Sequence, residues 1–137
     1  VINLCELLQE HPMTREEITI NYDFDARQTN YYTDAARYLG LVDKQRTDDI
    51  TFSLTSKGRS ILRLSYKQRQ LAFCEAILSH KVFSDSLKLW FEKGEIDKQD
   101  IVAIMKKNNL YNVESESTYT RRASTIRSWL DWIVGLL

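Results

Sequence analysis

A segment near the carboxyl end of the chain combines arginines with hydroxyl side chains and contains no acid. Residues 117–130 include three arginines and no Asp or Glu. Arginine can hold the edge of a guanine with two hydrogen bonds, and hydroxyls can reach phosphates or bases. The alternative is that these arginines are solvated charges that pair with Glu114, Glu116 or Asp131. The residues expected to contact DNA here are Thr118, Tyr119, Arg121, Arg122, Thr125, Arg127 and Ser128.

An earlier segment, RQTNYYTDAARYLGLV at residues 27–42, raises the same question. Gln28 and Asn30 carry amide groups that can read adenine, although both are equally common at the start of a helix. Asp34 would repel phosphate unless it is paired, which makes this segment a weaker candidate than residues 117–130. Its candidate DNA contacts are Arg27, Gln28, Asn30, Tyr31 and Arg37.

Both segments fit helices that turn one apolar face to a core and hold their polar side chains away from it. The apolar residues recur at the spacing of a helix with 3.6 residues per turn. The predicted core faces are Ala123, Ile126, Leu130 and Ile133 in the later segment, and Tyr32, Ala35, Ala36 and Leu39 in the earlier one.

Other basic residues lie between these two segments. Lys44 and Arg46 belong to a predicted β-hairpin whose tip carries Asp48 and Asp49, and those acids disfavour a close approach of phosphate at the tip. A basic run follows, which is either a backbone-binding ridge or the solvated face of a connecting helix, and we favour the solvated face. It comprises Lys57, Arg59, Arg63, Lys67 and Arg69.

The chain contains an internal repeat, which indicates two similar modules. Residues 4–18 align with residues 87–101 without a gap, and residues 29–42 align with residues 120–133. The first pair is offset by 83 positions and the second by 91, so the second copy has eight extra residues in a loop. The shared order of the two matches argues against chance.

The first copy also contains helix-start signals that the second copy repeats. Thr14 with Glu17 resembles a capping box, in which the two side chains satisfy each other's backbone donors. Asp97 with Asp100 is the shorter version in the second copy. Each copy is therefore predicted to contain a helix, a tight connection and a second, capped helix.

Three helices followed by a β-hairpin is the order of a winged helix-turn-helix. In the first copy, strand-like stretches at residues 41–46 and 50–54 follow the third helix. In the second copy the wing is expected to begin at Ile133, where the chain ends soon afterwards. We predict a mainly α fold with a small β-hairpin wing, built as two tandem winged helix-turn-helix modules at residues 1–64 and 65–137, the second truncated at its wing.

A resemblance to a known group of proteins supports this interpretation. The stretches YYTDAARYLGLVDK and ITFSLTSKGRSIL resemble winged-helix modules of bacterial DNA-processing proteins. The stretch STYTRRASTIRSWLDWI, with Trp129 and Leu130, is similar to recognition-region helices of type II, especially type IIS, restriction endonucleases. The resemblance implies the target-recognition part of such a protein, but it does not carry over the nuclease.

No catalytic motif is found in the sequence. A restriction-type nuclease site needs an acidic-x-Lys triplet to hold a metal ion and orient water, and the chain has neither Asp-x-Lys nor Glu-x-Lys. A glycine-rich phosphate loop and a Gly-x-Ser-x-Gly elbow are also absent. We therefore expect no enzyme activity, cofactor or metal in these residues.

Composition limits the partners and the compartment. Equal numbers of basic and acidic residues, 19 each, argue mildly against a wholly electrostatic nucleic-acid binder, although a local patch can still bind. No apolar run approaches the ~20 residues that span a bilayer. Cys5 and Cys74 fit buried thiols in a reducing cytoplasm. A start at Val1 inside a helical pattern suggests a piece of a longer protein with other domains.

Two classes of function remain open from the sequence. The first is binding of double-stranded DNA by tandem winged helices, in a restriction enzyme or a transcriptional regulator. The second is a protein-interaction or dimerisation module, since winged helices can keep their fold and lose DNA binding. A homodimer is left open in both cases.

Overall fold

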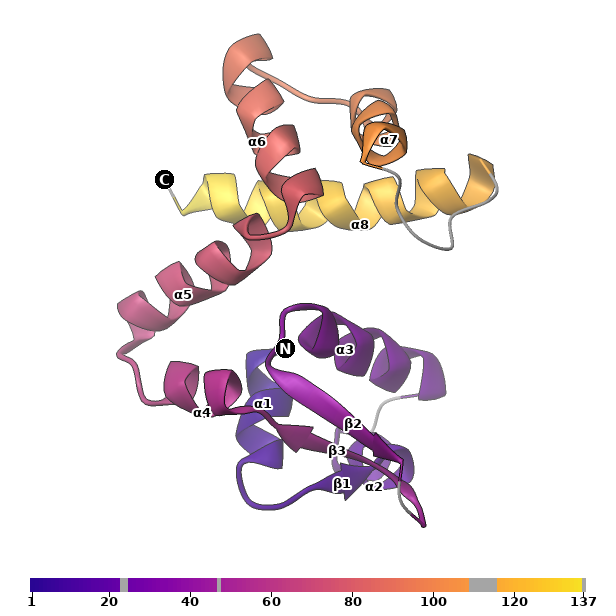
Figure 1. Cartoon of the computed structure of the whole chain (residues 1–137), viewed down its shortest axis with the longest axis vertical. Coiled ribbons are helices and arrows are strands. Elements are labelled where there is room, and N and C mark those ends of the chain that lie inside the picture. Colours follow the sequence, from indigo (N-terminus) through magenta and orange to yellow (C-terminus); the bar gives the residue numbers. More distant parts are fainter. Residues whose placement is uncertain (23–24, 47, 109–115, 137) are drawn as a thin grey trace. The chain divides into compact units, whose positions relative to one another are not determined.

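The protein is mainly helical with a small three-stranded antiparallel sheet, as predicted (Figure 1). The structure is a computed structural model that describes residues 1–22, 25–46, 48–108 and 116–136, with residues 116–118 described by their backbone alone. The chain divides into two compact units, Val1–Phe73 and Cys74–Leu137. This division lies inside a helix, later than the boundary after residue 64 that the sequence suggested.

The first unit has the element order of a winged helix. Its elements are α1 (Ile2–Leu8), β1 (Met13–Thr14), α2 (Arg15–Tyr22), α3 (Ala26–Tyr38), β2 (Val42–Arg46), β3 (Ile50–Leu54), α4 (Ser56–Leu62) and the first part of α5 (Tyr66–Leu78). The strands lie in the order β1–β3–β2, with Val42 opposite Leu54 and Met13 opposite Phe52. The β2–β3 hairpin packs beside α3, which is the helix expected to face DNA.

Local sequence explains how α2 and α3 begin and end. The predicted capping box is present, because the Thr14 amide donates to Glu17 Oε1 and the Glu17 amide donates to Thr14 Oγ1, each at 3.2 Å. Helix α3 ends at Tyr38 with Leu39 as its C-cap, and Gly40 follows with a φ of 77°, which suits a residue without a side chain. The Leu41 amide then donates to the Ala36 carbonyl at 2.9 Å, which directs the chain into β2.

The first unit has a continuous apolar core. Ile18, Ala36, Leu41 and Phe52 are fully buried, and Leu39 is 3% exposed. Ala35 is buried as well, whereas Tyr32 is half-buried, at the edge where it was expected. The sequence did not indicate that Thr29 and Thr33 are also fully buried.

The second unit contains the same three helices in order. They are α6 (Lys81–Lys93), α7 (Lys98–Lys107) and α8 (Glu116–Gly135). Both α6 and α7 pack on α8 (Figure 1). The predicted core face of α8 is confirmed, since Ala123, Ile126, Leu130 and Ile133 are all at most 6% exposed.

The repeat is visible in the burial of matched positions. Ile18 and its counterpart Ile101 are both fully buried, and Leu39 and Leu130 are at most 3% exposed. The capping box at Asp97 is also present, with the Asp100 amide donating to Asp97 Oδ1 at 2.8 Å.

One expectation for the second unit is wrong. The sequence suggested that a wing begins at Ile133, but α8 continues to Gly135 and the described part of this unit contains no strand. The reason is that Ile133 extends the buried face of Ile126 and Leu130 by a further turn, with no helix breaker before Gly135. The structure thus has a wing in the first unit and a three-helix arrangement in the second.

Candidate nucleic-acid interface

Helix α3 of the first unit is held against the core by its threonines. Thr29 Oγ1 lies 2.8 Å from Thr19 Oγ1 of α2, and Thr33 Oγ1 donates to the Thr29 carbonyl at 2.9 Å. Both bonds satisfy buried hydroxyls, and the contact between Thr29 and Thr19 joins α3 to α2. The opposite side of α3 faces solvent and carries Arg27, Asn30 and Arg37.

Gln28 and Tyr31, two predicted contacts on α3, are engaged by neighbouring residues. The Gln28 side chain accepts a hydrogen bond from the Asp25 amide at 3.0 Å, and the Gln28 amide donates to Asp25 Oδ1 at 2.9 Å. Gln28 is therefore a capping residue rather than a free reader of adenine. Tyr31 is 44% exposed, and its ring packs edge-on against Tyr32 with centroids 5.3 Å apart.

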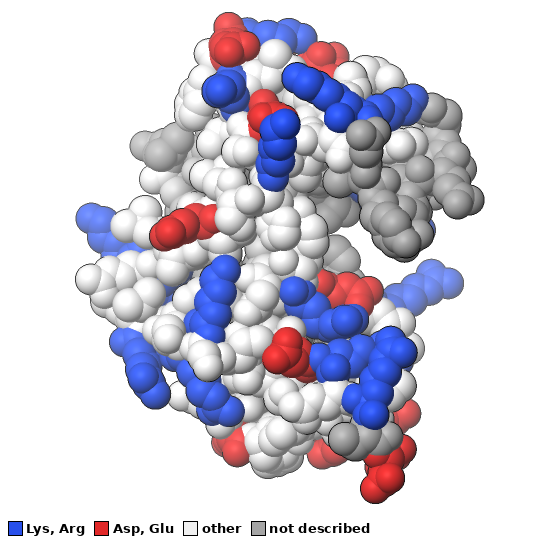
Figure 2. Space-filling model, in the orientation of Figure 1, with Lys and Arg blue, Asp and Glu red and all other residues white. Residues whose placement is uncertain are grey.

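Four cations from three elements converge next to α3, and we call them the wing-base cluster: Arg15 of α2, Arg37 of α3, and Lys44 and Arg46 of β2. Lys44 is paired with Phe52 across the sheet, and the Arg15 guanidinium lies over the Phe52 ring, 5.6 Å from its centroid. Lys44 and Arg46 are two residues apart on one strand and so point to the same face. Figure 2 shows Lys and Arg side chains gathered over this part of the first unit.

The cations of the wing-base cluster influence one another. Desolvation and the neighbouring charges of Arg46, Arg15 and Arg37 lower the pKa of Lys44, whereas Asp34 raises it. Asp34 lies 3.9 Å from Arg37, which is a loose and largely exposed pair. Positive charge therefore exceeds negative charge around Lys44. Arg15, whose Nε is buried without a hydrogen-bond partner, was not among the predicted site residues.

The basic run at residues 57–69 is partly engaged within the protein. Lys57 Nζ donates to the Leu39 carbonyl at 3.2 Å, which satisfies the end of α3. Arg69 pairs with Glu6 at 3.2 Å and donates to the Leu62 carbonyl at 2.8 Å. Arg59, Arg63 and Lys67 are exposed. Exposed cations are common to a solvated face and to a backbone-binding ridge, so the solvated-face interpretation stays a prediction.

In the second unit, Arg127 has an intramolecular role. Its Nε donates to Asp131 at 3.3 Å, its Nη1 donates to the Ile96 carbonyl, and its guanidinium lies 5.2 Å from the centroid of the Trp90 ring. Asp131 was one of the acids considered as an alternative partner. We therefore treat Arg127 as a residue that connects α8 to α6 and to the loop before α7, and no longer as a DNA contact.

The other candidates of α8 are more open. Arg121 and Arg122 are exposed, and no ion pair of either is found among the described residues. Tyr119 is half-buried under Lys106 of α7, whose Nζ lies 5.3 Å from the ring centroid. Thr125 is half-buried, Ser128 is exposed and donates to the Ser124 carbonyl at 3.1 Å, and the side chain of Thr118 lies outside the described residues.

Comparison with known proteins places the chain in a family. The model of a domain of unknown function, DUF7226, matches residues 1–137. The chain belongs to the DUF7226 family. No curated protein and no solved structure matches it significantly.

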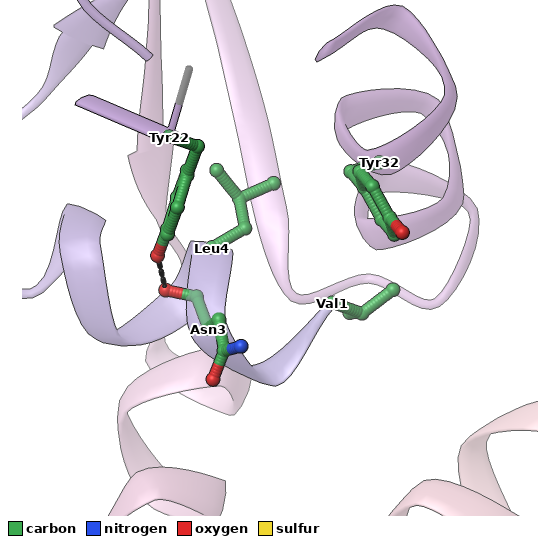
Figure 3. A pocket seen from close by; sticks show the side chains of 5 residues that line it. All are labelled: Val1, Asn3, Leu4, Tyr22 and Tyr32. Atoms are coloured by element: carbon green, nitrogen blue, oxygen red, sulfur yellow. Dashed lines mark hydrogen bonds between the residues drawn. The ribbon is translucent and has the colours of Figure 1, made fainter. Parts of the chain in front are cut away.

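The DUF7226 chain also has a small pocket in its first unit (Figure 3). The pocket has a volume of about 310 Å³ and is lined by Val1, Asn3, Leu4, Tyr22 and Tyr32. The Tyr22 hydroxyl donates to the backbone carbonyl of Asn3 at its wall. No Asp, Glu, His, Lys or Arg side chain is among these lining residues.

The DUF7226 chain was also compared with the requirements of a metal site and of a membrane-spanning helix, as follows for its described residues. Across the described ranges, no three His, Cys, Asp or Glu residues come together as a metal site. None of the helices in the same ranges is long and apolar enough to cross a bilayer.

Proposed function

We propose that this DUF7226 chain binds double-stranded DNA, with the winged-helix unit as its main contact. The observation that carries the proposal is the wing-base cluster, which joins α3 to the wing. In a helix-turn-helix protein the recognition helix enters the major groove, while neighbouring elements contact the backbone. Cations at the junction of α3 and β2 lie where such backbone contacts are made. The zero net charge of the chain is compatible with this role because binding depends on the local field.

The similarity of residues 117–133 to recognition regions of type II restriction endonucleases supports a more specific role. We place the chain as the DNA-reading part of such a protein, without a catalytic role of its own. A protein that reads cellular or incoming DNA would act in the cytoplasm.

The proposal is tested by fluorescence anisotropy of a labelled random 20-base-pair duplex at several salt concentrations. We expect binding that weakens steeply with salt, because each neutralised phosphate contributes about 0.9 to the slope of log K against log salt. The variant Arg37→Ala/Lys44→Ala/Arg46→Ala should lose affinity on the order of a hundredfold at 0.1 M salt.

A matched control distinguishes the effect of the wing-base cluster from the effect of removing three positive charges anywhere in the first unit. The variant Arg59→Ala/Arg63→Ala/Lys67→Ala removes the same number of exposed cations outside the cluster. It should keep the affinity of the unchanged protein within about threefold. Absence of binding by the unchanged protein at 20 mM salt would rule out the proposed function.

A protein-interaction role is the second candidate, and it has its own observation. In the second unit, Phe91 is 61% exposed, Trp132 39% and Leu136 40%. Exposed aromatic side chains are enriched at protein interfaces. Sedimentation that shows a stable dimer, lost in Phe91→Ser/Trp132→Ser and accompanied by no DNA affinity, would favour this role.

A further inference from the structure

We infer that the two units contribute differently to DNA binding: the wing-base cluster holds phosphates regardless of sequence, and Arg121 and Arg122 of α8 discriminate between bases. This inference rests on the proposed DNA binding. It assigns affinity and specificity to separate surfaces of the same chain.

The wing-base cluster suits a formally charged partner. Arg15, Arg37, Lys44 and Arg46 come from three elements, and among the groups that act on Lys44 the three arginines outnumber the acid Asp34, which pairs loosely with Arg37. Cations held this close repel one another, and an anion relieves that repulsion. The edge of a base carries only partial charges, whereas the DNA backbone carries a full charge on every phosphate. Several cations grouped together therefore suit the backbone, where successive phosphates can neutralise them at once.

Helix α3 itself has few side chains left for reading bases. Gln28 is engaged in the cap with Asp25, and Tyr31 packs against Tyr32. Asp34 is mostly exposed on the same helix and would face the phosphates unfavourably. These observations leave Arg27 and Asn30 as exposed readers, at the opposite end of α3 from Arg37.

Helix α8 presents a different set of groups. Arg121 and Arg122 lie in its amino-terminal part, and from residue 117 to residue 130 the helix has no acid. The hydroxyls of Ser124 and Ser128 donate to backbone carbonyls one turn earlier, at 3.2 and 3.1 Å. The two arginines are thus the long, exposed donors of this surface, and arginine paired with guanine is the commonest specific contact to DNA.

Lys106 adds a backbone contact at the same end of α8. It lies over Tyr119, one helical turn before Arg122, and it belongs to the last turn of α7. In Figure 2, Lys and Arg side chains gather over α7 of the second unit. A lysine beside two arginines can fix the helix on the backbone while the arginines reach the groove.

The experiment selects bound duplexes from a pool with a random 20-base-pair core and sequences them, using the full chain throughout. Three proteins are compared: the unchanged chain, Arg37→Ala/Lys44→Ala/Arg46→Ala, and Arg121→Ala/Arg122→Ala. Circular dichroism establishes that each variant is folded, and anisotropy gives the salt dependence.

We expect the unchanged chain to enrich a guanine-containing sequence. The wing-base variant should enrich the same sequence with weaker binding, and its salt slope should be less steep by about three. The Arg121→Ala/Arg122→Ala variant should lose the enriched sequence, while its affinity for random DNA falls less than about tenfold.

The outcomes separate this inference from the proposed function. If the unchanged chain binds no DNA, the proposed function fails, and the inference fails with it. If it binds DNA but enriches no sequence, or if Arg121→Ala/Arg122→Ala enriches the same sequence, DNA binding stands and the division of roles is wrong. A changed preference in the wing-base variant would also overturn the division.

Discussion

Arg127 shows how a residue suited to DNA by its type can be engaged elsewhere. Its residue type and its position among polar residues predicted a DNA contact, and its side chain is 37% exposed. The guanidinium nevertheless reaches Asp131, the Ile96 carbonyl and the Trp90 ring. A charged side chain with three partners in different elements holds those elements in one arrangement, so we assign Arg127 to the positioning of α8.

Arg127→Gln should lower the free energy of unfolding of the second unit by about 1–2 kcal/mol, because it loses a charged hydrogen bond and a cation–π contact that are partly screened by solvent. Urea denaturation followed by tryptophan fluorescence measures the change. Arg122→Gln, at an exposed position, should alter it by less than about 0.5 kcal/mol. If Arg127→Gln instead kept full stability and flattened the salt dependence of DNA binding, Arg127 would be a phosphate contact.

Cys5 gives the first unit a dependence on alkaline pH. Burial raises the pKa of its thiol from 9.0 to about 11. The folded state therefore keeps its proton to higher pH than the unfolded state does, and the stabilisation present below pH 9 is lost as pH rises to about 11. The loss amounts to about 2–3 kcal/mol over that window.

The Cys5→Ala variant tests this dependence. The difference in free energy of unfolding between the unchanged protein and Cys5→Ala should shrink by about 2–3 kcal/mol from pH 8.5 to pH 11, since the alanine does not titrate. Urea titrations at each pH measure the two free energies of unfolding. Lysines and tyrosines titrate in both proteins, so their contributions cancel in the difference. A constant difference would show that the thiol is not protected by burial.

At the scale of elements, α4 packs closely against Leu41, the residue that precedes β2. A Cβ atom at Gly58 would lie 2.4 Å from the Leu41 carbonyl oxygen and 2.9 Å from Leu54 Cδ2. The Gly58 amide also donates to Thr55 Oγ1 at 3.0 Å in the cap of α4. The glycine therefore permits a close approach of helix and strand, although alanine is intrinsically the better helix former.

Gly58→Ala is expected to destabilise the first unit by about 1–3 kcal/mol, because the backbone carbonyl of Leu41 must move to make room. Thermal unfolding monitored by circular dichroism measures the effect. Gly135→Ala is the control, since nothing lies within 4 Å of a Cβ there. A Gly58→Ala protein as stable as the unchanged one would show that α4 can shift without cost.

Sequence was informative where one element determines its own structure. The spacing of Ala123, Ile126, Leu130 and Ile133 predicted the buried face of α8, and Thr14 with Glu17 predicted the cap of α2. Both signals lie within a few residues of chain. The prediction at Ile133 was wrong. The apolar helix pattern continues through this residue, and α8 extends to Gly135 where a wing strand was expected to begin.

The candidate site depends on contacts that local sequence does not reveal. Arg15 comes beside Lys44 only because β1 pairs with β3 and β3 pairs with β2. Arg127 likewise meets Trp90 only through the packing of α6 on α8. Charge and residue type could thus predict candidate residues. Which of them lie together, and which of them have partners within the protein, depends on the tertiary fold.

At the scale of the whole molecule, each unit has its own buried centre. Phe52 is fully buried in the first unit and Met105 in the second. Because the repeat places a three-helix core in both, each unit contains the apolar residues that a cooperative folding unit needs. We expect a substitution in the core of one unit to destabilise that unit and to leave the stability of the other unit unchanged.

Met105→Ala should cost about 2–5 kcal/mol and speed amide hydrogen exchange in α7 and α8, while α3 and β3 keep their protection. Phe52→Ala should produce the opposite pattern. Exchange measured by mass spectrometry on peptic fragments distinguishes the two. Faster exchange throughout the chain in either variant would show that the units fold as one.

The order β1–β3–β2 has a consequence for solubility. Strand β2 is one of the two outer strands of the sheet, so within the described residues one row of its backbone donors and acceptors has no strand beside it. Such an edge can template aggregation between molecules, and charged side chains oppose it. Asp43, Lys44 and Arg46 occupy three of the five positions of β2. Charged side chains at these positions oppose pairing of β2 with a strand of another molecule.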